Sequence, residues 1–281
     1  MIVDIHTHLF SKDVREHREN YFDSESAFRL LYESPKSKIV SAEDTVASMD
    51  EDGVDVSVVF GFPWRSLKTA RENNDAVAEA VARYPSRLVG FCCLDPTVPG
   101  ADKEAARCLD AGLSGVGELA FYESGIGEDA LDRLSPIMDL CRERDVPVMI
   151  HTNEPVGHLY PGKTANTLAE IYRLVKRFSE NRIILAHWGA GLLFYVLLKK
   201  EVADVLRRVW VDTAASPYLY RPEIYPLAAK IFGADKILFG TDFPLLRPAR
   251  YFKEMAAAGL SDSDREMILG KNARHLLGLQ R

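Results

Sequence analysis

The sequence predicts an α/β protein built as a (β/α)8 barrel, the TIM-barrel architecture. Eight short apolar runs rich in β-branched residues alternate with longer stretches of helical periodicity. Most of these runs are hydrophobic almost throughout, as expected of parallel strands that are covered on both faces. The chain has 281 residues, and a barrel of this kind commonly has about 250. We therefore expect one domain over residues 1–281.

The expected strands and helices alternate along the whole chain, which is the pattern of a barrel of parallel strands. The expected strands are residues 2–8, 54–62, 88–95, 115–121, 146–151, 183–187, 209–213 and 237–241. The expected helices are residues 43–51, 67–84, 102–111, 130–144, 166–178, 192–208, 222–232 and 261–278. Ser261 or Ser263 is expected to cap the last of these helices.

One segment departs from this alternation. The stretch between the first and second strands is longer than a single helix requires, and residues 43–51 account for the crossover helix. This leaves an insertion at about residues 11–41, which is rich in charged and aromatic residues. A loop of this length is often a lid or a pocket wall, and an ordinary surface excursion is the alternative.

Composition and charge favour a globular enzyme without a nucleic-acid partner. Hydrophobic residues make up 47% of the chain and charged residues 27%, and the net charge is −6. Binding to a phosphate backbone requires clustered Lys and Arg, so we expect no nucleic-acid partner. No signal sequence is visible, and no apolar run approaches the roughly 18 residues of a membrane span. The four cysteines are expected to be reduced, buried thiols, so a cytoplasmic protein with no membrane partner is expected.

Histidines stand at the ends of three expected strands. His6 and His8 lie two residues apart in the first strand, so their side chains share one face. His151 ends the apolar fifth strand and His187 ends the sixth. An imidazole buried there without a partner would cost about 1–3 kcal/mol, which favours a ligand role. A hydrogen-bonded core histidine is the alternative for each.

Carboxylates complete this set at two further strand ends. Glu118 closes the fourth strand, where it could bridge two ions, act beside one, or form a salt bridge within the barrel. Asp242 follows the eighth strand and could bind a metal, accept a proton, or cap the next segment. Asp4 shares the face of the first-strand histidines but lies deeper, so a structural role is expected. Imidazoles and carboxylates are natural zinc ligands, and a barrel gathers strand ends at one face. One or two divalent ions, most simply Zn²⁺, are therefore predicted.

These motifs resemble the amidohydrolase superfamily over nearly the whole chain. The narrower resemblance is to its amidohydrolase-related branch (amidohydrolase 2), which includes the aminocarboxymuconate-semialdehyde and resorcylate decarboxylases. The matching segments are Asp4-x-His6-x-His8, Met49-Asp50-Glu51-Asp52-Gly53-Val54-Asp55, His151, Leu185-Ala186-His187-Trp188-Gly189, Gly240-Thr241-Asp242-Phe243-Pro244 and Ile268-Leu269-Gly270-Lys271-Asn272-Ala273 with Leu276-Leu277-Gly278.

The resemblance implies a set of metal ligands and a departure from the decarboxylases. It implies that His6, His8, His151 and Asp242 hold metal, because they match the motif positions. The sixth-strand histidine is then a ligand in two-metal members, or an acid/base group and substrate contact in one-metal members. Glu118 looks more like the Gly-Glu strand ends of TatD-like hydrolases than like the decarboxylases. This departure favours hydrolysis, and self-association is a further implication of the resemblance.

The leading functional hypothesis is a metal-dependent hydrolase of a small carbonyl substrate, a lactone, amide or ester. A bound ion lowers the pKa of its water towards about 7. Asp242 would accept the water proton and pass it to the leaving group, and His187 would polarise the carbonyl. The alternative is non-oxidative decarboxylation of an aromatic or unsaturated carboxylic acid. A TatD-like nuclease is disfavoured by the acidic charge balance, and a non-catalytic binding protein is the alternative of another class.

Five residues after strand ends are candidates for contact with the small-molecule substrate, because each could hold an anionic or aromatic group. A solvent-exposed surface role is the alternative for each. They are Trp64, Arg65, Tyr122, His158 and Arg247.

Overall fold

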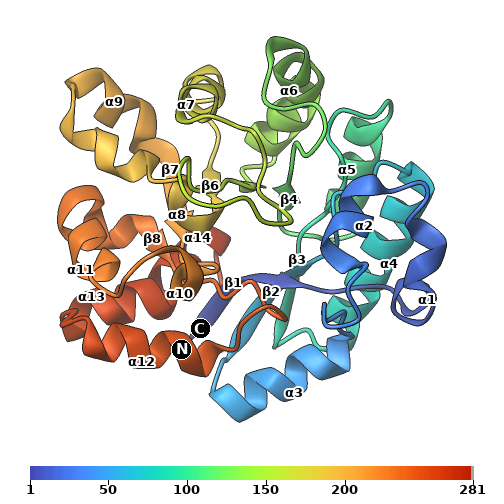
Figure 1. Cartoon of the computed structure of the whole chain (residues 1–281), viewed down its shortest axis with the longest axis horizontal. Coiled ribbons are helices and arrows are strands. Elements are labelled where there is room, and N and C mark those ends of the chain that lie inside the picture. Colours follow the sequence, from blue (N-terminus) through green and yellow to red (C-terminus); the bar gives the residue numbers. More distant parts are fainter. Residues whose placement is uncertain (280–281) are drawn as a thin grey trace.

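The computed structural model describes residues 1–279, in which eight short parallel strands form a central ring surrounded by helices (Figure 1). Each strand lies inside one of the eight predicted runs, and most are shorter than predicted. The strands are β1 (Val3–His8), β2 (Val56–Phe60), β3 (Leu88–Gly90), β4 (Val116–Leu119), β5 (Val148–Ile150), β6 (Ile183–Leu185), β7 (Val209–Asp212) and β8 (Ile237–Leu238).

Two ladders of strands are joined into one ring by backbone contacts. Strands β1–β3 form one parallel ladder and β4–β8 the other. The bridge between Cys92 and Val116 joins β3 to β4, and the bridge between Thr7 and Phe243 joins β1 to the residues after β8. The Ile5 amide also donates to the Phe239 carbonyl at 2.8 Å. The predicted barrel is therefore confirmed.

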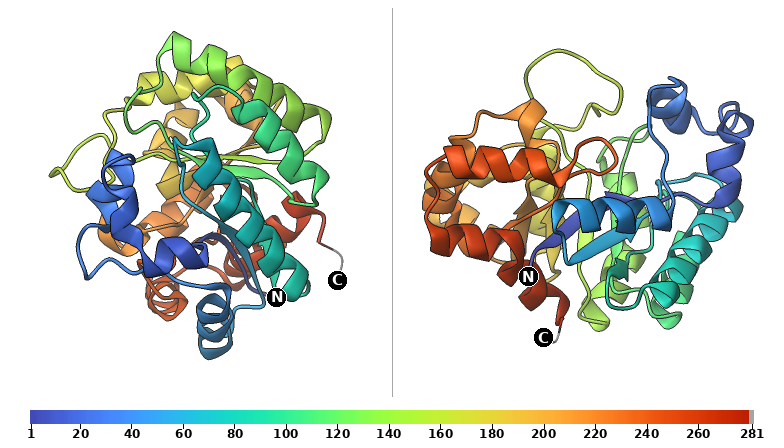
Figure 2. Two further views of the ribbon diagram at one scale, coloured as in Figure 1. Left: turned by 90° about the vertical axis from the view of Figure 1, so that its right-hand side faces the viewer. Right: turned by 90° about the horizontal axis from the view of Figure 1, so that it is seen from below.

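Side chains point alternately to the two faces of each strand, and this produces two apolar cores, one inside the ring and one between the strands and the helices. Ile184 of β6 and Met149 of β5 belong to a cluster inside the ring, whereas their neighbours Ile183 and Leu185 pack outward against the helices. The inner cluster also includes Leu276 of the last helix, α14 (Asn272–Leu277), which closes the end of the barrel near the termini (Figure 2). The opposite end carries the carboxyl ends of the strands.

The helical layer follows most of the sequence predictions. The predicted helices are observed as α3 (Ala42–Asp52), α4 (Leu67–Arg83), α5 (Ala101–Asp110), α6 (Glu128–Glu143), α7 (Leu168–Arg177), α11 (Ile224–Ala228) with its continuation Ala229–Gly233, and α13 (Asp262–Glu266), which runs through Met267–Lys271 into α14. Ser261 caps α13 by accepting from the Asp264 amide at 3.1 Å, as predicted. None of the described helices has the length and apolarity that a membrane span requires.

Two helix predictions need correction. The predicted helix at 192–208 is broken into a 3₁₀ turn (Leu192–Leu197), the short α9 (Lys200–Val205) and a final 3₁₀ turn (Leu206–Arg208). The break falls at Lys199, whose backbone is extended (φ −124°, ψ 152°). The sequence analysis also missed α12 (Pro248–Ala257), which begins with a proline at its first turn.

The insertion at 11–41 is packed onto the carboxyl end of the barrel. It forms α1 (Lys12–Glu16), a 3₁₀ turn (Arg18–Tyr21) and α2 (Ser26–Tyr32). Phe28 of α2 is fully buried, with its ring 4.5 Å from that of Trp64 after β2. Figure 2 shows the insertion at the same end of the barrel as the long loop between β5 and α7. This position fits a wall of the site better than a surface excursion.

Candidate metal centre

Two histidines at the end of β1 present one ring nitrogen each to the centre of the barrel mouth. The Nδ1 atom of His6 lies 2.9 Å from Asp212 Oδ2, and the Nδ1 atom of His8 lies 3.1 Å from the Gly61 carbonyl. Both partners are acceptors, so each Nδ1 carries the proton. The Nε2 lone pair of both rings is therefore free to face a cation.

His187 reaches the same point from the end of β6 with the same ring orientation. Its Nδ1 lies 3.1 Å from the Ala214 carbonyl. Its backbone is left-handed (φ 57°), as is that of Trp188 (φ 60°), which turns the chain sharply after the strand. The turn directs the Nε2 atom inward, where it lies 3.4 Å from a carboxylate oxygen of Glu118.

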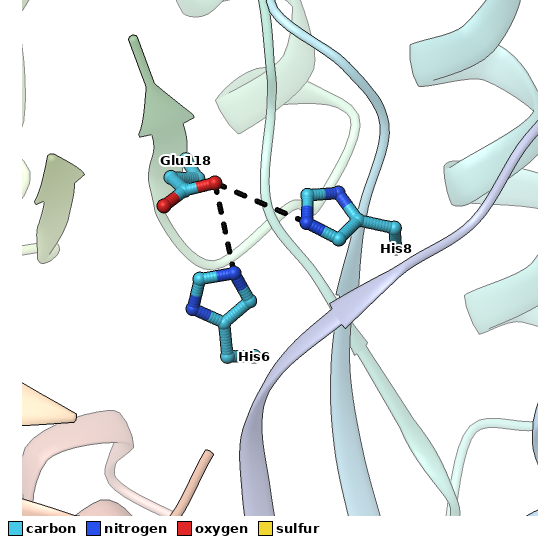
Figure 3. A group of neighbouring side chains, drawn as sticks. All are labelled: His6, His8 and Glu118. Carbon is cyan, nitrogen blue, oxygen red and sulfur yellow. Dashed lines mark ion pairs between the residues drawn. The ribbon is translucent and has the colours of Figure 1, made fainter. Parts of the chain in front are cut away.

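Glu118 occupies the middle of the cluster, with its carboxylate directed at both β1 histidines (Figure 3). Its Oε2 atom lies 3.6 Å from His6 Nε2 and 3.9 Å from His8 Nε2. Its Oε1 atom lies 3.0 Å from His151 Nδ1 and 3.4 Å from His187 Nε2. One carboxylate thus faces two pairs of imidazoles from opposite sides.

Asp242 completes the cluster from the residues that follow β8. Its Oδ1 atom lies 3.2 Å from His8 Nε2 and 3.7 Å from His6 Nε2. Its own amide donates to the His6 carbonyl at 3.0 Å, which fixes the eighth strand end beside the first. The six side chains predicted from strand ends are therefore brought together, and their role as metal ligands stays a prediction.

His151 is oriented differently from the other three histidines. Its Nε2 lies 3.2 Å from the carbonyl of Gly162, in the loop between β5 and α7, so that nitrogen donates to the loop. Its Nδ1 consequently faces Glu118 at 3.0 Å. Gly162 has φ +93°, a conformation that favours glycine. No residue type in the sequence signals this contact, because a backbone carbonyl of the loop after β5 makes it.

Burial and charge together set the protonation of the cluster. Burial lowers the pKa of His6, but the carboxylates of Glu118 and Asp212 hold that pKa well above its usual value. Burial raises the pKa of Glu118, but the charges of His6 and His151 hold it well below its usual value. The same balance lowers the pKa of Asp242 and raises that of His187 to about 9. The centre therefore keeps its carboxylates ionised.

The spacing of the donor atoms fits a metal ion. Bond lengths of about 2.0–2.2 Å in a tetrahedral site put neighbouring donors about 3.4 Å apart. The three groupings of His6, His8, Glu118, His151, His187 and Asp242 have donor atoms within 4.8 Å of one another. The Nε2 atom of His6 is buried and has no hydrogen-bond partner among the described residues. A buried nitrogen of this kind is costly unless something binds it, and a cation at the centre would do so.

Asp4 lies below the centre, in the structural position that the sequence predicted. Its Oδ1 atom accepts from the amides of His6 and Thr241, each at 3.1 Å, and its Oδ2 accepts from the Thr241 hydroxyl at 2.5 Å. Burial raises the pKa of Asp4 to about 7. These contacts tie β1 to the end of β8 beneath the histidines.

Of the five predicted substrate residues, Tyr122 lies beside the centre. Its ring lies 5.6 Å from the ring of His151 and stacks nearly parallel to Phe62 at 6.0 Å. Tyr32 of the insertion reaches the same aromatic group, 6.0 Å from Phe62. The sequence analysis did not single out Tyr32, which lies far along the chain from every strand end.

Trp64 and Arg65 have other partners. Trp64 has no exposed surface and its indole N–H donates to Asn73 at 3.2 Å, so the structure places it in the core rather than at the centre. Its predicted contact with substrate stays a prediction, and in this structure the ring has no exposed surface. Arg65 pairs with Glu123 at 2.6 Å at the surface.

Arg247 and His158 are also directed away from the six clustered side chains. Arg247 pairs with Glu51 at 2.6 Å and with Asp52 at 2.9 Å. His158 is exposed on the loop between β5 and α7, with its ring 5.9 Å from that of Tyr160. Their predicted contact with substrate stays a prediction, and in this structure neither contacts the centre.

The sequence analysis missed Asp212, which ends β7 and contacts His6. A signal was available, because Asp212 is an acidic residue that closes an otherwise apolar strand. It is the same signal that identified Glu118 and Asp242. The sequence alone does not say that this carboxylate lies behind the histidines instead of beside them.

Comparison with known proteins identifies relatives along the whole chain. The family described as Amidohydrolase matches residues 3–279. Gamma-resorcylate decarboxylase of Polaromonas sp. strain JS666 is 24% identical over 88% of this chain and 90% of its own length. The 2-amino-3-carboxymuconate-6-semialdehyde decarboxylase of Dictyostelium discoideum is 23% identical over 99% of this chain and 91% of its own length.

Solved structures agree on the fold. A dihydroxybenzoic acid decarboxylase from Polaromonas sp. JS666, with bound manganese and the inhibitor 2-nitroresorcinol, superposes with a TM-score of 0.73 at 22% identity, over 100% of this chain and 97% of that one. A 5-carboxyvanillate decarboxylase from Novosphingobium aromaticivorans, also with manganese, gives a TM-score of 0.78 at 17% identity, over 99% and 97%. The family match spans nearly every residue and confirms the resemblance in the strand-end motifs: the chain belongs to the amidohydrolase family.

Proposed function

We propose that this protein is a metal-dependent decarboxylase that removes carbon dioxide, without oxidation, from an aromatic or unsaturated carboxylic acid. The observation that carries the proposal is the convergence of His8, Glu118 and Asp242 beside the buried Nε2 atom of His6, which has no hydrogen-bond partner in the part of the chain that the structure describes. The decarboxylase relatives favour this reaction over the hydrolysis that the sequence analysis put first.

A divalent ion would be held by His6, His8 and Asp242, with Glu118 and His151 as further donors. Such an ion would bind and polarise the oxygen atoms of an acidic substrate. Manganese is bound in both solved structures described above, and nitrogen and oxygen donors suit Mn²⁺ as well as Zn²⁺. We therefore propose a divalent cation and leave zinc as one of two candidates.

His187 is the proposed proton donor. Decarboxylation breaks the bond between the carboxyl carbon and its neighbour, and that neighbour must gain a proton as carbon dioxide leaves. The Nε2 atom of His187 faces the centre while its Nδ1 is held by the Ala214 carbonyl. The carboxylates of Glu118 and Asp242 raise the pKa of His187 and so favour its protonated form. The aromatic rings of Tyr122 and Phe62 would flank a flat substrate at this position.

Hydrolysis of a lactone, amide or ester is the second candidate, because of Glu118. A carboxylate that faces two pairs of imidazoles suits two cations better than one. Asp242 would then accept a proton from water and pass it to the leaving group. This candidate requires the product to carry one added water molecule.

The test separates the two reactions by their products. The protein is loaded with Mn²⁺ or Zn²⁺ and incubated with dihydroxybenzoates and 5-carboxyvanillate, and in parallel with lactones and esters. We expect carbon dioxide release from an acid and its loss on treatment with a chelator. Conversion of lactones or esters alone, with no carbon dioxide from any acid, would contradict the proposal. His187→Asn should abolish turnover, and His275→Asn, an exposed histidine of α14, is the matched control.

A further inference from the structure

We infer that Asp212, at the end of β7, is a positioning residue that fixes two residues of the proposed site, the metal donor His6 and the proton donor His187, from outside that site. Because the donors belong to the proposed site, the inference rests on the proposed function. Asp212 is fully buried, and both of its carboxylate oxygens are used on these two histidines and on Ala214.

One oxygen sets the tautomer of His6. Asp212 Oδ2 lies 2.9 Å from His6 Nδ1, and neither side chain has exposed surface. A carboxylate can only accept, so Nδ1 must carry a proton whatever the charge of the ring. The lone pair available for a metal is consequently on Nε2, the buried atom that has no hydrogen-bond partner within residues 1–279. A carboxylate behind a histidine ligand fixes its ring and raises its basicity.

The other oxygen holds the turn that carries His187. Asp212 Oδ1 accepts from the His187 amide at 2.8 Å and from the Ala214 amide at 3.0 Å. The Ala214 carbonyl in turn lies 3.1 Å from His187 Nδ1. The segment 212–214 thus binds both the backbone amide and the ring of His187. His187 has a left-handed backbone with φ 57°, a conformation that must be stabilised by contacts of this kind.

The two histidines that Asp212 contacts both reach the carboxylate of Glu118. The fixed Nε2 atoms of His6 and His187 lie 3.6 Å and 3.4 Å from its two carboxylate oxygens. Asp212 therefore couples the metal donor of β1 to the proton donor that follows β6, and these two strands are not neighbours in the ring. A change at Asp212 should disturb metal binding without removing any group that touches the metal.

Asp212→Asn tests this directly because the two side chains have the same shape. The amides of His187 and Ala214 both need an acceptor, so the amide oxygen of the new side chain takes that place. Its NH₂ group then faces His6 Nδ1, which must accept, and the His6 proton moves to Nε2. The variant should keep its fold and lose His6 as a donor.

The first measurement is Mn²⁺ affinity, by competition with a chromophoric chelator, together with the absorption spectrum of the Co²⁺ form. We expect Asp212→Asn to bind about 10–100-fold more weakly than wild type, with an altered Co²⁺ spectrum. Glu104→Gln is the matched control, since it neutralises a buried carboxylate of α5 outside the centre and should leave the affinity unchanged. An affinity of Asp212→Asn equal to that of wild type would overturn the inference.

The second measurement needs neither metal nor a variant. In metal-free wild-type protein labelled with ¹⁵N-histidine, the His6 Nδ1 resonance, assigned with His6→Asn, should be that of a protonated nitrogen. An unprotonated Nδ1 would refute the role of Asp212. If wild type binds no Mn²⁺, Zn²⁺ or Co²⁺, the proposed function fails, and this resonance still decides whether Asp212 sets the ring.

Discussion

At the scale of single residues, backbone carbonyls decide which nitrogen His8, His151 and His187 present to the centre, and the Asp212 carboxylate decides it for His6. The Gly61 carbonyl fixes His8, the Ala214 carbonyl fixes His187, and the Gly162 carbonyl turns His151 the other way. The residue types at the strand ends could be read from the sequence, but these orientations could not. They depend on carbonyls from other loops, whose positions follow only from the closed barrel.

The first residue-scale prediction concerns His8. His8→Ala removes a donor 3.2 Å from Asp242 and 3.9 Å from Glu118. We expect loss of bound metal and of turnover, because the ion loses one of the β1 donors. Metal analysis and circular dichroism check this, and the spectrum should match wild type. Full activity in His8→Ala would remove the β1 pair from the mechanism.

The second residue-scale prediction concerns Asp242. Asp242→Asn keeps the shape of the side chain but removes its charge beside His8 and His6. We expect kcat to fall by orders of magnitude even where some metal is retained, because the ion that polarises the substrate loses its charged donor. Steady-state kinetics on metal-saturated protein measures this. A kcat within twofold of wild type would show that turnover does not need the Asp242 carboxylate.

At the scale of elements, one buried carboxylate joins helices α4 and α5. Glu104 of α5 is almost fully buried and accepts from Arg107 at 2.7 and 2.8 Å and from Asn74 of α4 at 3.2 Å. Arg71 of α4 also donates to it at 3.1 Å. The sequence showed both helices, but it could not show that one carboxylate joins them.

The contacts of Glu104 predict that the free energy of unfolding depends on pH. Burial raises the pKa of Glu104, but hydrogen bonds from Arg107, Asn74 and Arg71 lower it from 4.5 to about 2. A lowered pKa stabilises the fold above the unfolded value, and the stabilisation is lost as pH falls from 4.5 towards 2. We expect Glu104→Gln to lower the free energy of unfolding in urea near neutral pH, and to lower it less near pH of about 3. An equal loss at both pH values would contradict this assignment.

At the scale of the whole molecule, the ends of the chain close the barrel. The amide of His8 donates to the Phe243 carbonyl at 2.7 Å, and the amide of Phe239 donates to the Ile268 carbonyl at 3.0 Å. Gly270 lies against the first residues of the chain, where an added Cβ would sit 2.1 Å from the Met1 carbonyl oxygen. The contact leaves no room for a side chain.

Gly270→Ala therefore tests the closure. The methyl group would push the closing helix away from β1, and overpacking of this kind costs about 1–3 kcal/mol. Thermal unfolding should show a lower midpoint. Gly127→Ala is the matched control, because a Cβ there meets nothing within 4 Å. An unchanged midpoint for Gly270→Ala would show that the two ends are not packed as described.

The eight-strand barrel was predictable because each strand is an apolar run between helices. The order of the strands around the ring follows from the same alternation. The break at Lys199 and the helix α12 were not predictable from periodicity alone. Likewise Trp64 carried an aromatic signal for the site, yet the insertion buries it against Phe28. Tertiary packing decided each of these.

The convergence of the β1 histidines with Asp242 on one cation is tested most directly by a crystal structure of the Mn²⁺-loaded protein with anomalous diffraction. The account predicts an anomalous peak within about 2.2 Å of His6 Nε2, His8 Nε2 and an Asp242 oxygen. A peak bound by other residues, or none between these three groups in fully loaded crystals, would contradict it.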